Sequence, residues 1–377
     1  MGTQRESWTK KYFTFAQPPE LMPIECGAKF GPITLAYETY GRLETNKDNV
    51  ILVLHAFSGD SHVASHEEGG EKAEEPGWWE FMVGPGKGID TKKYFVICSN
   101  ILGGCMGTTG PASINPLTGE QYGMNFPVVT IKDMVRAQKM LLDQLGITRL
   151  VTVIGGSMGG MQALQWCADY PEMVASAVLL ATTMRHSAQA IAFNEIARQA
   201  IMTDPKWNRG KYSASDRPEL GLAVARMIGH VTYLSDEAMR RKFGRRLQDR
   251  CDLSFDFDVD FQVESYLRYQ GKKFVQRFDA NSLLYITKAA DYFDFTSVDS
   301  EPLTSMAHAG IRFLVTSFSS DWLYPTYRSK ELVRLLKKNS IDVSFCEIQA
   351  DCGHDAFLIP SDRLTNLIAG FLKGIRG

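Results

Sequence analysis

The sequence lacks the features that would tie it to a membrane, to nucleic acid or to an oxidising compartment. It has no apolar run long enough to cross a bilayer. Its 41 basic and 43 acidic residues leave a net charge of only -2, so we expect neither a nucleic-acid nor a membrane partner. The seven cysteines are scattered and none forms a C-x-x-C pair, which favours reduced thiols and predicts no metal site.

The beginning of the chain also carries no targeting signal. Residues 1–13 lack the apolar core of a signal peptide, and Glu6 stands where a myristoylation signal needs Ser or Thr. We therefore expect a cytoplasmic protein. Its 377 residues suit one large α/β domain with an insertion, or two domains.

A strand, a glycine-rich turn and a helix are predicted around Ser157. Residues 151–154 are β-branched, as in a strand buried on both faces, and apolar residues recur at helical spacing after Gly160. Between them, GGSMG fits the G-x-S-x-G pattern of a nucleophile elbow, whose small residues let a strained serine project above a sheet. A phosphate loop would need a Lys that is absent, and a dinucleotide-binding turn would need Gly in place of Ser157. The elbow is the favoured interpretation.

Apolar runs and helical segments alternate along most of the chain, which predicts an α/β fold with a mostly parallel sheet. Central strands are expected at 50–55, 94–98, 151–154, 177–180, 311–318 and 343–348, with edge strands at 13–16 and 33–40. Residues 185–294 interrupt this order with helical patterning alone. We expect residues 1–184 and 295–377 to form the catalytic domain and 185–294 an inserted all-helical lid.

Within the predicted lid, helices are expected at 190–202, 220–228, 237–247 and 261–278. Six basic residues gather between positions 240 and 250. A phosphate site is one interpretation of this cluster, but a solvated helix face is the favoured one.

An acid and a base follow the last two predicted strands, at the ends where open α/β sheets bind ligands. Asp321 comes just after 311–318, and His354 just after 343–348. Elbow enzymes order their triad as Ser, Asp or Glu, then His, which predicts Ser157 as nucleophile, Asp321 as orienting acid and His354 as base. Asp355 and Asp351 are weaker rivals of Asp321 because they lie beside the base. The other histidines considered are expected to be structural: His55, His62, His186, His230 and His308.

Charge that develops on a substrate oxygen needs backbone N–H donors. In this architecture one donor is the residue after the nucleophile, here Met158, and the other lies after an early central strand, here near Phe57. Only the backbone is needed, so a bulky side chain at Phe57 is admissible.

Many longer segments point beyond the fold. They include HAFSGDSHV at 55–63, PGWW at 76–79, GGCMGTTGPASINP at 103–116, SAQAIAFNEIARQAI at 187–201, ARMIGHVTYLS at 225–235, SDWLYP at 320–325 and GHDAFL at 353–358. With these motifs in order, nearly end to end, the chain resembles the homoserine O-acyltransferase family of the α/β-hydrolase superfamily. Phe57 is a departure, since members usually carry Leu there.

The resemblance implies transfer of an acetyl group from acetyl-CoA to the hydroxyl of L-homoserine for methionine biosynthesis, with no cofactor. It implies that Arg226, helped by Tyr233, holds the homoserine carboxylate and that Asp355 holds the ammonium. Succinyl-using members carry Arg two residues after the triad Asp. Leu323 stands at that position and favours the acetyl donor. The family also implies a homodimer joined through lid helices.

Three alternatives remain open from the sequence. A homoserine O-succinyltransferase would differ in the acyl donor. A serine esterase or thioesterase would use the same triad, and a binding module without activity is least favoured because all three triad residues are present.

Overall fold

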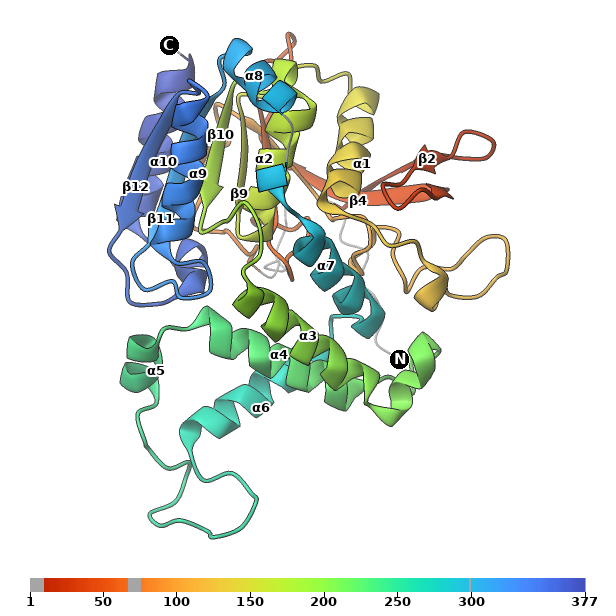
Figure 1. Cartoon of the computed structure of the whole chain (residues 1–377), viewed down its shortest axis with the longest axis vertical. Helices are drawn as coiled ribbons and strands as arrows, with labels where there is room; N and C mark the ends of the chain where they lie inside the picture. Colours follow the sequence, from red (N-terminus) through yellow and green to blue (C-terminus); the bar gives the residue numbers. More distant parts are fainter. Residues whose placement is uncertain (1–9, 67–75, 298–299, 377) are drawn as a thin grey trace.

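An eight-stranded sheet forms the centre of the molecule (Figure 1). The computed structural model describes residues 10–66, 76–297 and 300–376. The strand order is β1-β4-β8-β5-β9-β10-β11-β12; β4 is antiparallel to β1 and β8, and the others run parallel. The strands are β1 (Lys11–Phe15), β4 (Ile33–Tyr40), β5 (Val50–Leu54), β8 (Phe95–Ser99), β9 (Thr152–Gly156), β10 (Ser176–Leu180), β11 (Arg312–Phe318) and β12 (Val343–Ile348). The mostly parallel α/β sheet is confirmed.

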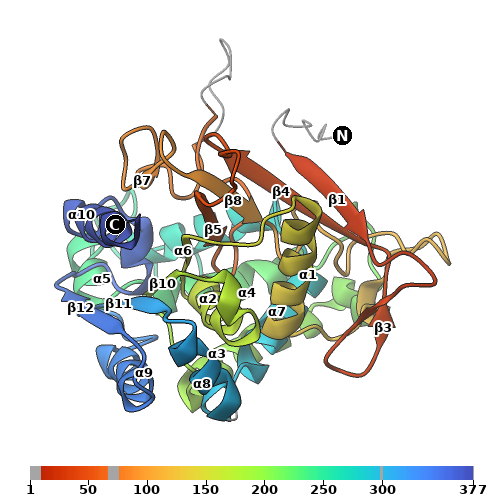
Figure 2. The same cartoon turned by 90° about the horizontal axis from the view of Figure 1, so that it is seen from above.

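Helices cover both faces of this sheet (Figure 2). One face carries α1 (Ile131–Gln144), α2 (Met158–Asp169), α8 (Ser300–His308) and α9 (Thr326–Lys338), and the other carries α10 (Asp362–Arg376). Helix α1 begins at a capping box, in which the Thr130 hydroxyl accepts from the N–H of Asp133 and the Asp133 carboxylate accepts from the N–H of Thr130.

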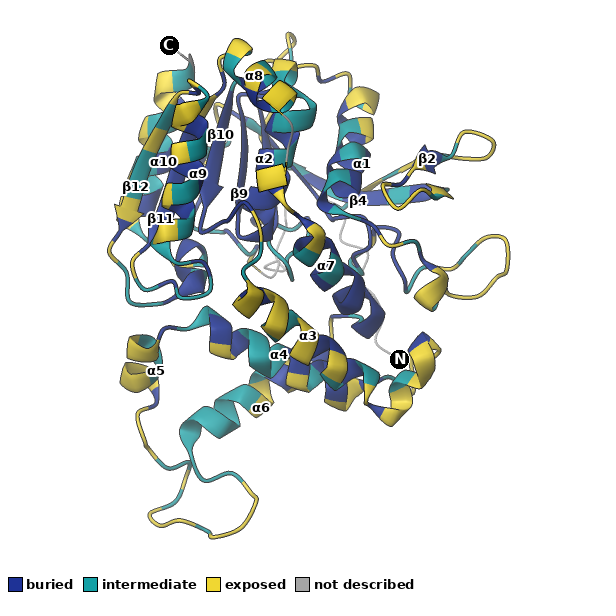
Figure 3. Ribbon diagram, in the orientation of Figure 1, coloured by how far each residue is buried: buried dark blue, intermediate teal, exposed yellow. Residues whose placement is uncertain are grey.

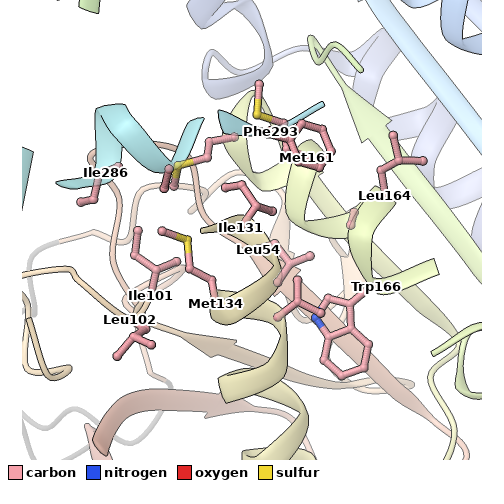
Figure 4. Close-up of a cluster of buried hydrophobic side chains, with 14 of the residues drawn as sticks. Leu54, Ile101, Leu102, Ile131, Met134, Met161, Leu164, Trp166, Ile286 and Phe293 are labelled. Atoms are coloured by element: carbon pink, nitrogen blue, oxygen red, sulfur yellow. The ribbon is translucent and has the colours of Figure 1, made fainter. Parts of the chain in front are cut away.

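The central strands are buried on both faces, which explains their continuous apolar sequences (Figure 3). In β5, Leu52 and Leu54 belong to the hydrophobic cluster with α1 and α2, and Ile51 and Val53 belong to the cluster with α10. Figure 4 shows part of the first cluster, where Trp166 of α2 lies near Leu54.

The helical segment 185–294 contains α3 (Ala188–Met202), α4 (Glu219–Tyr233), α5 (Asp236–Lys242), α6 (Gln262–Val275) and α7 (Ala280–Tyr292). Helices α3, α4 and α6 lie beyond the carboxyl ends of the parallel strands (Figure 1). Helix α7 was not predicted from the sequence. It contributes Ile286 to the hydrophobic cluster that also contains residues of the sheet (Figure 4).

The two ends of the helical segment 185–294 lie side by side. Arg185 and Asp294 form an antiparallel bridge, and the N–H of Phe295 donates to the carbonyl of Met184 at 2.8 Å. We call these four residues the stem.

Two predicted helix ends in the segment were wrong. The helix expected at 237–247 ends at Lys242, because Gly244 adopts φ +54° just after it. The helix expected to end at 228 continues to Tyr233, with Gly229 inside it.

Short elements complete the fold. Two small sheets pair β2 (Met22–Pro23) with β3 (Lys29–Phe30) and β6 (Val83–Gly84) with β7 (Ile89–Asp90). Five 3-10 turns lie at Gly123–Asn125, Pro171–Met173, Pro205–Gly210, Phe295–Ser297 and His354–Leu358. Within the residues that the structure describes, no helix is long and apolar enough to cross a membrane.

Candidate active site

Ser157 lies in the sharp turn between β9 and α2. Its backbone has φ 55° and ψ -123°, a conformation that side-chain-bearing residues rarely adopt. Two hydrogen bonds hold it there, from the N–H of Ser157 to the carbonyl of Leu180 at 2.9 Å and from the Thr182 hydroxyl to the carbonyl of Ser157 at 2.8 Å. The neighbouring strand β10 therefore fixes the turn on both sides of the serine.

The glycines of the turn are required by close backbone contacts. A Cβ on Gly159 would lie 2.1 Å from the carbonyl oxygen of Leu54, and one on Gly155 would lie 2.4 Å from the carbonyl carbon of Gly159. Neither backbone can retreat without moving β5 or α2, so the sequence pattern reflects a steric need.

Ser157, His354 and Asp321 form one hydrogen-bonded chain. Ser157 Oγ lies 2.8 Å from His354 Nε2, and His354 Nδ1 lies 2.8 Å from Asp321 Oδ2. All three are buried, with 7, 2 and 3% of their surfaces exposed. The three residues that the sequence analysis selected each follow a different strand, and the structure brings them together.

The Asp321 carboxylate is held on its second oxygen as well. Asp321 Oδ1 accepts from the N–H groups of Leu323 at 3.0 Å and Tyr324 at 2.9 Å, which fixes the orientation of the carboxylate. Burial is the largest single influence on His354 and lowers its pKa. The charge and hydrogen bond of Asp321, together with the charge of Asp355, outweigh burial, and the net pKa of His354 is raised.

The loop that carries His354 is anchored on both sides. The N–H of Gly353 donates to Ser320 Oγ at 2.9 Å, and Trp79 Nε1 donates to the carbonyl of Phe357 at 2.9 Å. Trp79 is 1% exposed, so this residue of the PGWW segment has a packing role. Gly353 has φ +86° and packs against the end of α4, where a Cβ would lie 2.4 Å from the carbonyl oxygen of Tyr233.

A pocket opens above Ser157. Its walls come from the sheet loops and from α3, α4, α6 and α7, and they are mostly apolar. Phe57 and Met158 both line it, and no hydrogen bond from either backbone N–H is found among the described residues. The N-terminus of α2 also points its free N–H groups toward this region, which suits a developing negative charge.

Arg226, on α4, is placed inside this pocket. Its guanidinium lies 4.7 Å from the ring centre of Phe274 and 5.6 Å from that of Tyr233, and Nη1 donates to Ser58 Oγ at 3.3 Å. No carboxylate among the described residues forms an ion pair with Arg226, so a cation with aromatic packing faces the space above the serine.

Tyr233 and Asp355 both lie near His354. The Tyr233 ring centre is 6.2 Å from that of His354, and burial raises the pKa of Tyr233. Burial also raises the pKa of Asp355, although the charges of His354 and Arg226 oppose this effect. Asp355 is half-buried, and no hydrogen bond to its carboxylate is found within the described part of the chain. It does not line the pocket as Arg226 and Tyr233 do.

Two pocket residues were missed or set aside from the sequence. His186 was expected to be structural because it lies in the helical segment, yet it lines the pocket together with Tyr324. The chain order of the triad excluded His186, and no spacing rule points to Tyr324. Both nevertheless lie in or beside motifs that the sequence shares with its family.

A separate group has the side chains of a metal site. Glu38, His62 and His66 hold their ligand atoms within 4.8 Å of one another. Glu38 Oε2 lies 2.9 Å from His62 Nδ1 and 3.2 Å from His66 Nε2, and it also accepts from the Tyr40 hydroxyl at 2.9 Å. Burial raises the pKa of Glu38, but these hydrogen bonds outweigh burial and the net pKa is lowered. These hydrogen bonds link the three side chains directly, and the absence of a metal stays a prediction.

Comparison with known proteins places this geometry in a family. The sequence model of the alpha/beta hydrolase fold matches residues 49–360. Homoserine O-acetyltransferase of Desulfotalea psychrophila is 66% identical over 368 residues, which cover 97% of this chain and 94% of the relative. That of Solidesulfovibrio magneticus is 60% identical, with coverages of 98% and 94%.

Solved structures with the same fold include enzymes of two activities. The crystal structure of homoserine O-acetyltransferase from Bacillus anthracis is similar with a TM-score of 0.88 and 32% identity, covering 96% of this chain and 97% of that one. Esterase E22 is similar with a TM-score of 0.86 and 31% identity, covering 96% and 99%. The identity over nearly the whole length of curated relatives shows that the chain belongs to the homoserine O-acetyltransferase family of the α/β-hydrolase superfamily.

Proposed function

We propose that the protein transfers the acetyl group of acetyl-CoA to the hydroxyl of L-homoserine through an acetyl-Ser157 intermediate. The observation that carries the proposal is the Ser157–His354–Asp321 chain beside a pocket that is also lined by Arg226, which forms no ion pair with any described residue. A serine alone is a weak nucleophile, and it needs exactly such an oriented base beside it.

The reaction has two half-reactions with the same machinery. Ser157 Oγ attacks the thioester carbon while its proton passes to His354 Nε2, and the CoA thiolate leaves and takes that proton. The homoserine hydroxyl then attacks the acetyl-serine, gives its proton to His354, and Ser157 recovers it. Backbone N–H groups of Met158 and Phe57 stabilise the oxyanion in both steps.

The acceptor is a zwitterion, and complementary charges lie in the pocket, at Arg226, and on the loop of His354, at Asp355. Arg226 holds the carboxylate, with Tyr233 packed against the guanidinium, and Asp355 attracts the ammonium. Burial raises the pKa of Asp355, and no ion pair to its carboxylate is found in the described part of the chain. The ammonium of homoserine would supply an ion-pair partner.

Leu323 supports acetyl rather than succinyl as the acyl group. It lines the pocket two residues after Asp321 and offers an apolar surface. A succinyl group would carry an unpaired carboxylate into this region, and burying such a charge is expensive. We expect a preference of at least about tenfold for acetyl-CoA, which needs only about 1.4 kcal/mol between transition states.

The test follows the two half-reactions separately. Mass spectrometry of protein mixed with acetyl-CoA alone should show one acetyl group on the Ser157 peptide, and Ser157→Ala should show none. Addition of homoserine should release O-acetylhomoserine. Acetyl-CoA and succinyl-CoA supplied together report the donor, and mostly O-succinylhomoserine would overturn the acetyl assignment.

The fold shared with esterase E22 makes hydrolysis the second candidate. In that case free acetate would form at the same rate with and without homoserine, and no O-acetylhomoserine would appear. The two activities use the same serine, so only the product analysis separates them.

We further propose that the helical segment acts as a lid over the pocket, that the protein is a cytoplasmic homodimer, and that it needs no cofactor. Exposed apolar side chains on α4 support the dimer: Leu220, Val224 and Val231 are 76, 44 and 38% exposed at positions i, i+4 and i+11. A second copy of the chain would cover this face.

A further inference from the structure

His55 directly follows β5 and binds the peptide group that joins Ala56 to Phe57. His55 Nδ1 is 2.8 Å from the carbonyl oxygen of Ala56, and the N–H of Gly59 donates to the same oxygen at 2.9 Å. The Ala56 carbonyl and the Phe57 N–H belong to one planar trans peptide group and point in opposite directions. The two hydrogen bonds that hold the carbonyl therefore also fix the direction of the Phe57 N–H.

The surroundings of His55 leave one position for its proton. The N–H of Ile101 donates to His55 Nε2 at 3.2 Å, and Asn100 Nδ2 lies 3.3 Å from the same atom. A ring nitrogen that accepts hydrogen bonds carries no proton, so the neutral imidazole is protonated on Nδ1 and donates to Ala56. Burial lowers the pKa of His55, which is 1% exposed, and this keeps the ring neutral.

The groups around His55 are themselves fixed. Asn100 follows β8, and its N–H donates to the carbonyl of Ala36 on β4 at 2.8 Å. The N–H of Met106 donates to Asn100 Oδ1 at 3.4 Å, so the amide presents Nδ2 to His55. On α2, Gln162 Nε2 donates to the carbonyl of His55 at 3.2 Å. The imidazole thus transmits the position of the sheet to the peptide group that follows β5.

The Phe57 N–H is a donor that needs such control. Phe57 lines the pocket, and no hydrogen bond from its backbone N–H is found in the described part of the chain. An oxyanion donor lowers the barrier only if its direction is set before the charge develops. Hydrogen bonds to the carbonyl of the same peptide group also polarise it, which makes its N–H a stronger donor.

We propose that His55 is a positioning residue for the oxyanion hole: by holding the Ala56 carbonyl, it aims the Phe57 N–H at the oxygen of the acyl group. His55 is not among the residues that line the pocket, so it acts through the peptide group and not on the substrate. The inference rests on the proposed function, in which Ser157 is acetylated and the Phe57 N–H stabilises the oxyanion.

Two variants of His55 each keep one half of its hydrogen bonding. In His55→Asn the amide nitrogen is bonded to Cγ, as Nδ1 is, so the donor to Ala56 is kept and the acceptor for the N–H of Ile101 is lost. In His55→Gln the amide lies one atom further out, near the position of Nε2. This variant keeps an acceptor for Ile101 and loses the donor to Ala56.

The test is the acetylation of Ser157 by p-nitrophenyl acetate, in which the Oγ–acetyl bond forms, p-nitrophenolate leaves and the serine proton passes to His354. In His55→Gln we expect the rate constant to fall at least about tenfold, toward the about 10²–10³-fold that follows loss of a whole oxyanion donor. The half-saturating ester concentration should not change, because the donor acts on the transition state.

The comparison with His55→Asn separates positioning from stability. His55→Asn should keep most of the wild-type rate, although its Tm should be lower than that of His55→Gln because it leaves the buried N–H of Ile101 unpaired. A purely structural role predicts the reverse order, with the rate following Tm. His308→Gln is the control, since His308 is exposed at the end of α8.

The acetyl carbonyl gives a second measurement on the same protein. In acetyl-Ser157 labelled with ¹³C, hydrogen bonds from the oxyanion hole lower the infrared stretching frequency of the carbonyl. The band should move to higher frequency in His55→Gln and stay at the wild-type position in His55→Asn. In the wild type, ¹⁵N spectra of the histidine side chains should show the His55 proton on Nδ1, with the signal assigned by its loss in His55→Asn.

Wild-type acetylation by His55→Gln with an unshifted carbonyl band would overturn the proposal. So would rates that follow Tm in the two variants, or a His55 proton on Nε2. The nitrogen spectrum and His55→Asn test the proposal even if His55→Gln does not fold. A Ser157→Ala protein that still became acetylated would instead contradict the nucleophile, and with it the proposed function.

Discussion

The charge of Asp321 has a direct effect on the pH at which His354 can act as a base. A base must be neutral, and the net pKa of His354 is raised above its ordinary 6.5. As the pH falls through that raised value His354 gains a proton, so we expect the acid limb of kcat/KM to lie above pH 6.5. The pH profile with p-nitrophenyl acetate measures this without interference from the acceptor's own titration.

Asp321→Asn supplies the comparison. Without the Asp321 charge, burial is opposed only by the charge of Asp355, so the pKa of His354 falls and the acid limb should move to lower pH. The rate should also fall, by about 10⁴-fold in the best-studied triad. An unmoved acid limb would assign it to a group other than His354.

Arg226 should matter to one half-reaction only. Losing a charge-assisted contact with the homoserine carboxylate should cost about 2–4 kcal/mol in kcat/KM for homoserine. Acetylation of Ser157 by acetyl-CoA should survive in Arg226→Ala, as rapid-quench mass spectrometry can measure. Arg226→Lys keeps the charge without the planar guanidinium, so its kcat/KM for homoserine should lie between those of the wild type and Arg226→Ala. Equal losses in both half-reactions would make Arg226 a structural residue.

At the scale of elements, the end of α4 supports the loop that carries the base. A Cβ on Gly353 would lie 2.4 Å from the carbonyl oxygen of Tyr233, at a φ that disfavours side chains. Gly353→Ala should therefore push His354 away from Ser157. We expect a large fall in kcat with only a small fall in Tm. Gly310→Ala is the matched control, because Gly310 also has positive φ (+69°) but nothing within 4 Å of an added Cβ.

Elements with a local cause could be predicted from the sequence, and others could not. The elbow and the strands that precede Asp321 and His354 follow from sterics and from apolar runs that neighbouring residues determine. Helix α7 was missed because it is buried nearly all round, so it has no polar face to mark its period. The place of His186 depends on Asp291 and Tyr324, which are 105 and 138 residues away along the chain.

At the scale of the whole molecule, the exposed side of α4 predicts the assembly. The double variant Leu220→Asp, Val224→Asp should be monomeric in light scattering, because a dimer through this face would bury two charges against the second copy. Leu117→Asp is the control, since Leu117 is 88% exposed on a loop outside the helical segment. Dimers that persist in the double variant would place the interface on another face.

The stem has an evolutionary consequence. Since Met184 and Arg185 lie beside Asp294 and Phe295, residues can be gained or lost within the helices between them without changing the register of β10 against β11. Mutations in these helices can thus change the pocket wall that contacts the acceptor, while Ser157, Asp321 and His354 keep their positions. A homoserine acetyltransferase and an esterase with one fold are the kind of descendants that such an arrangement allows.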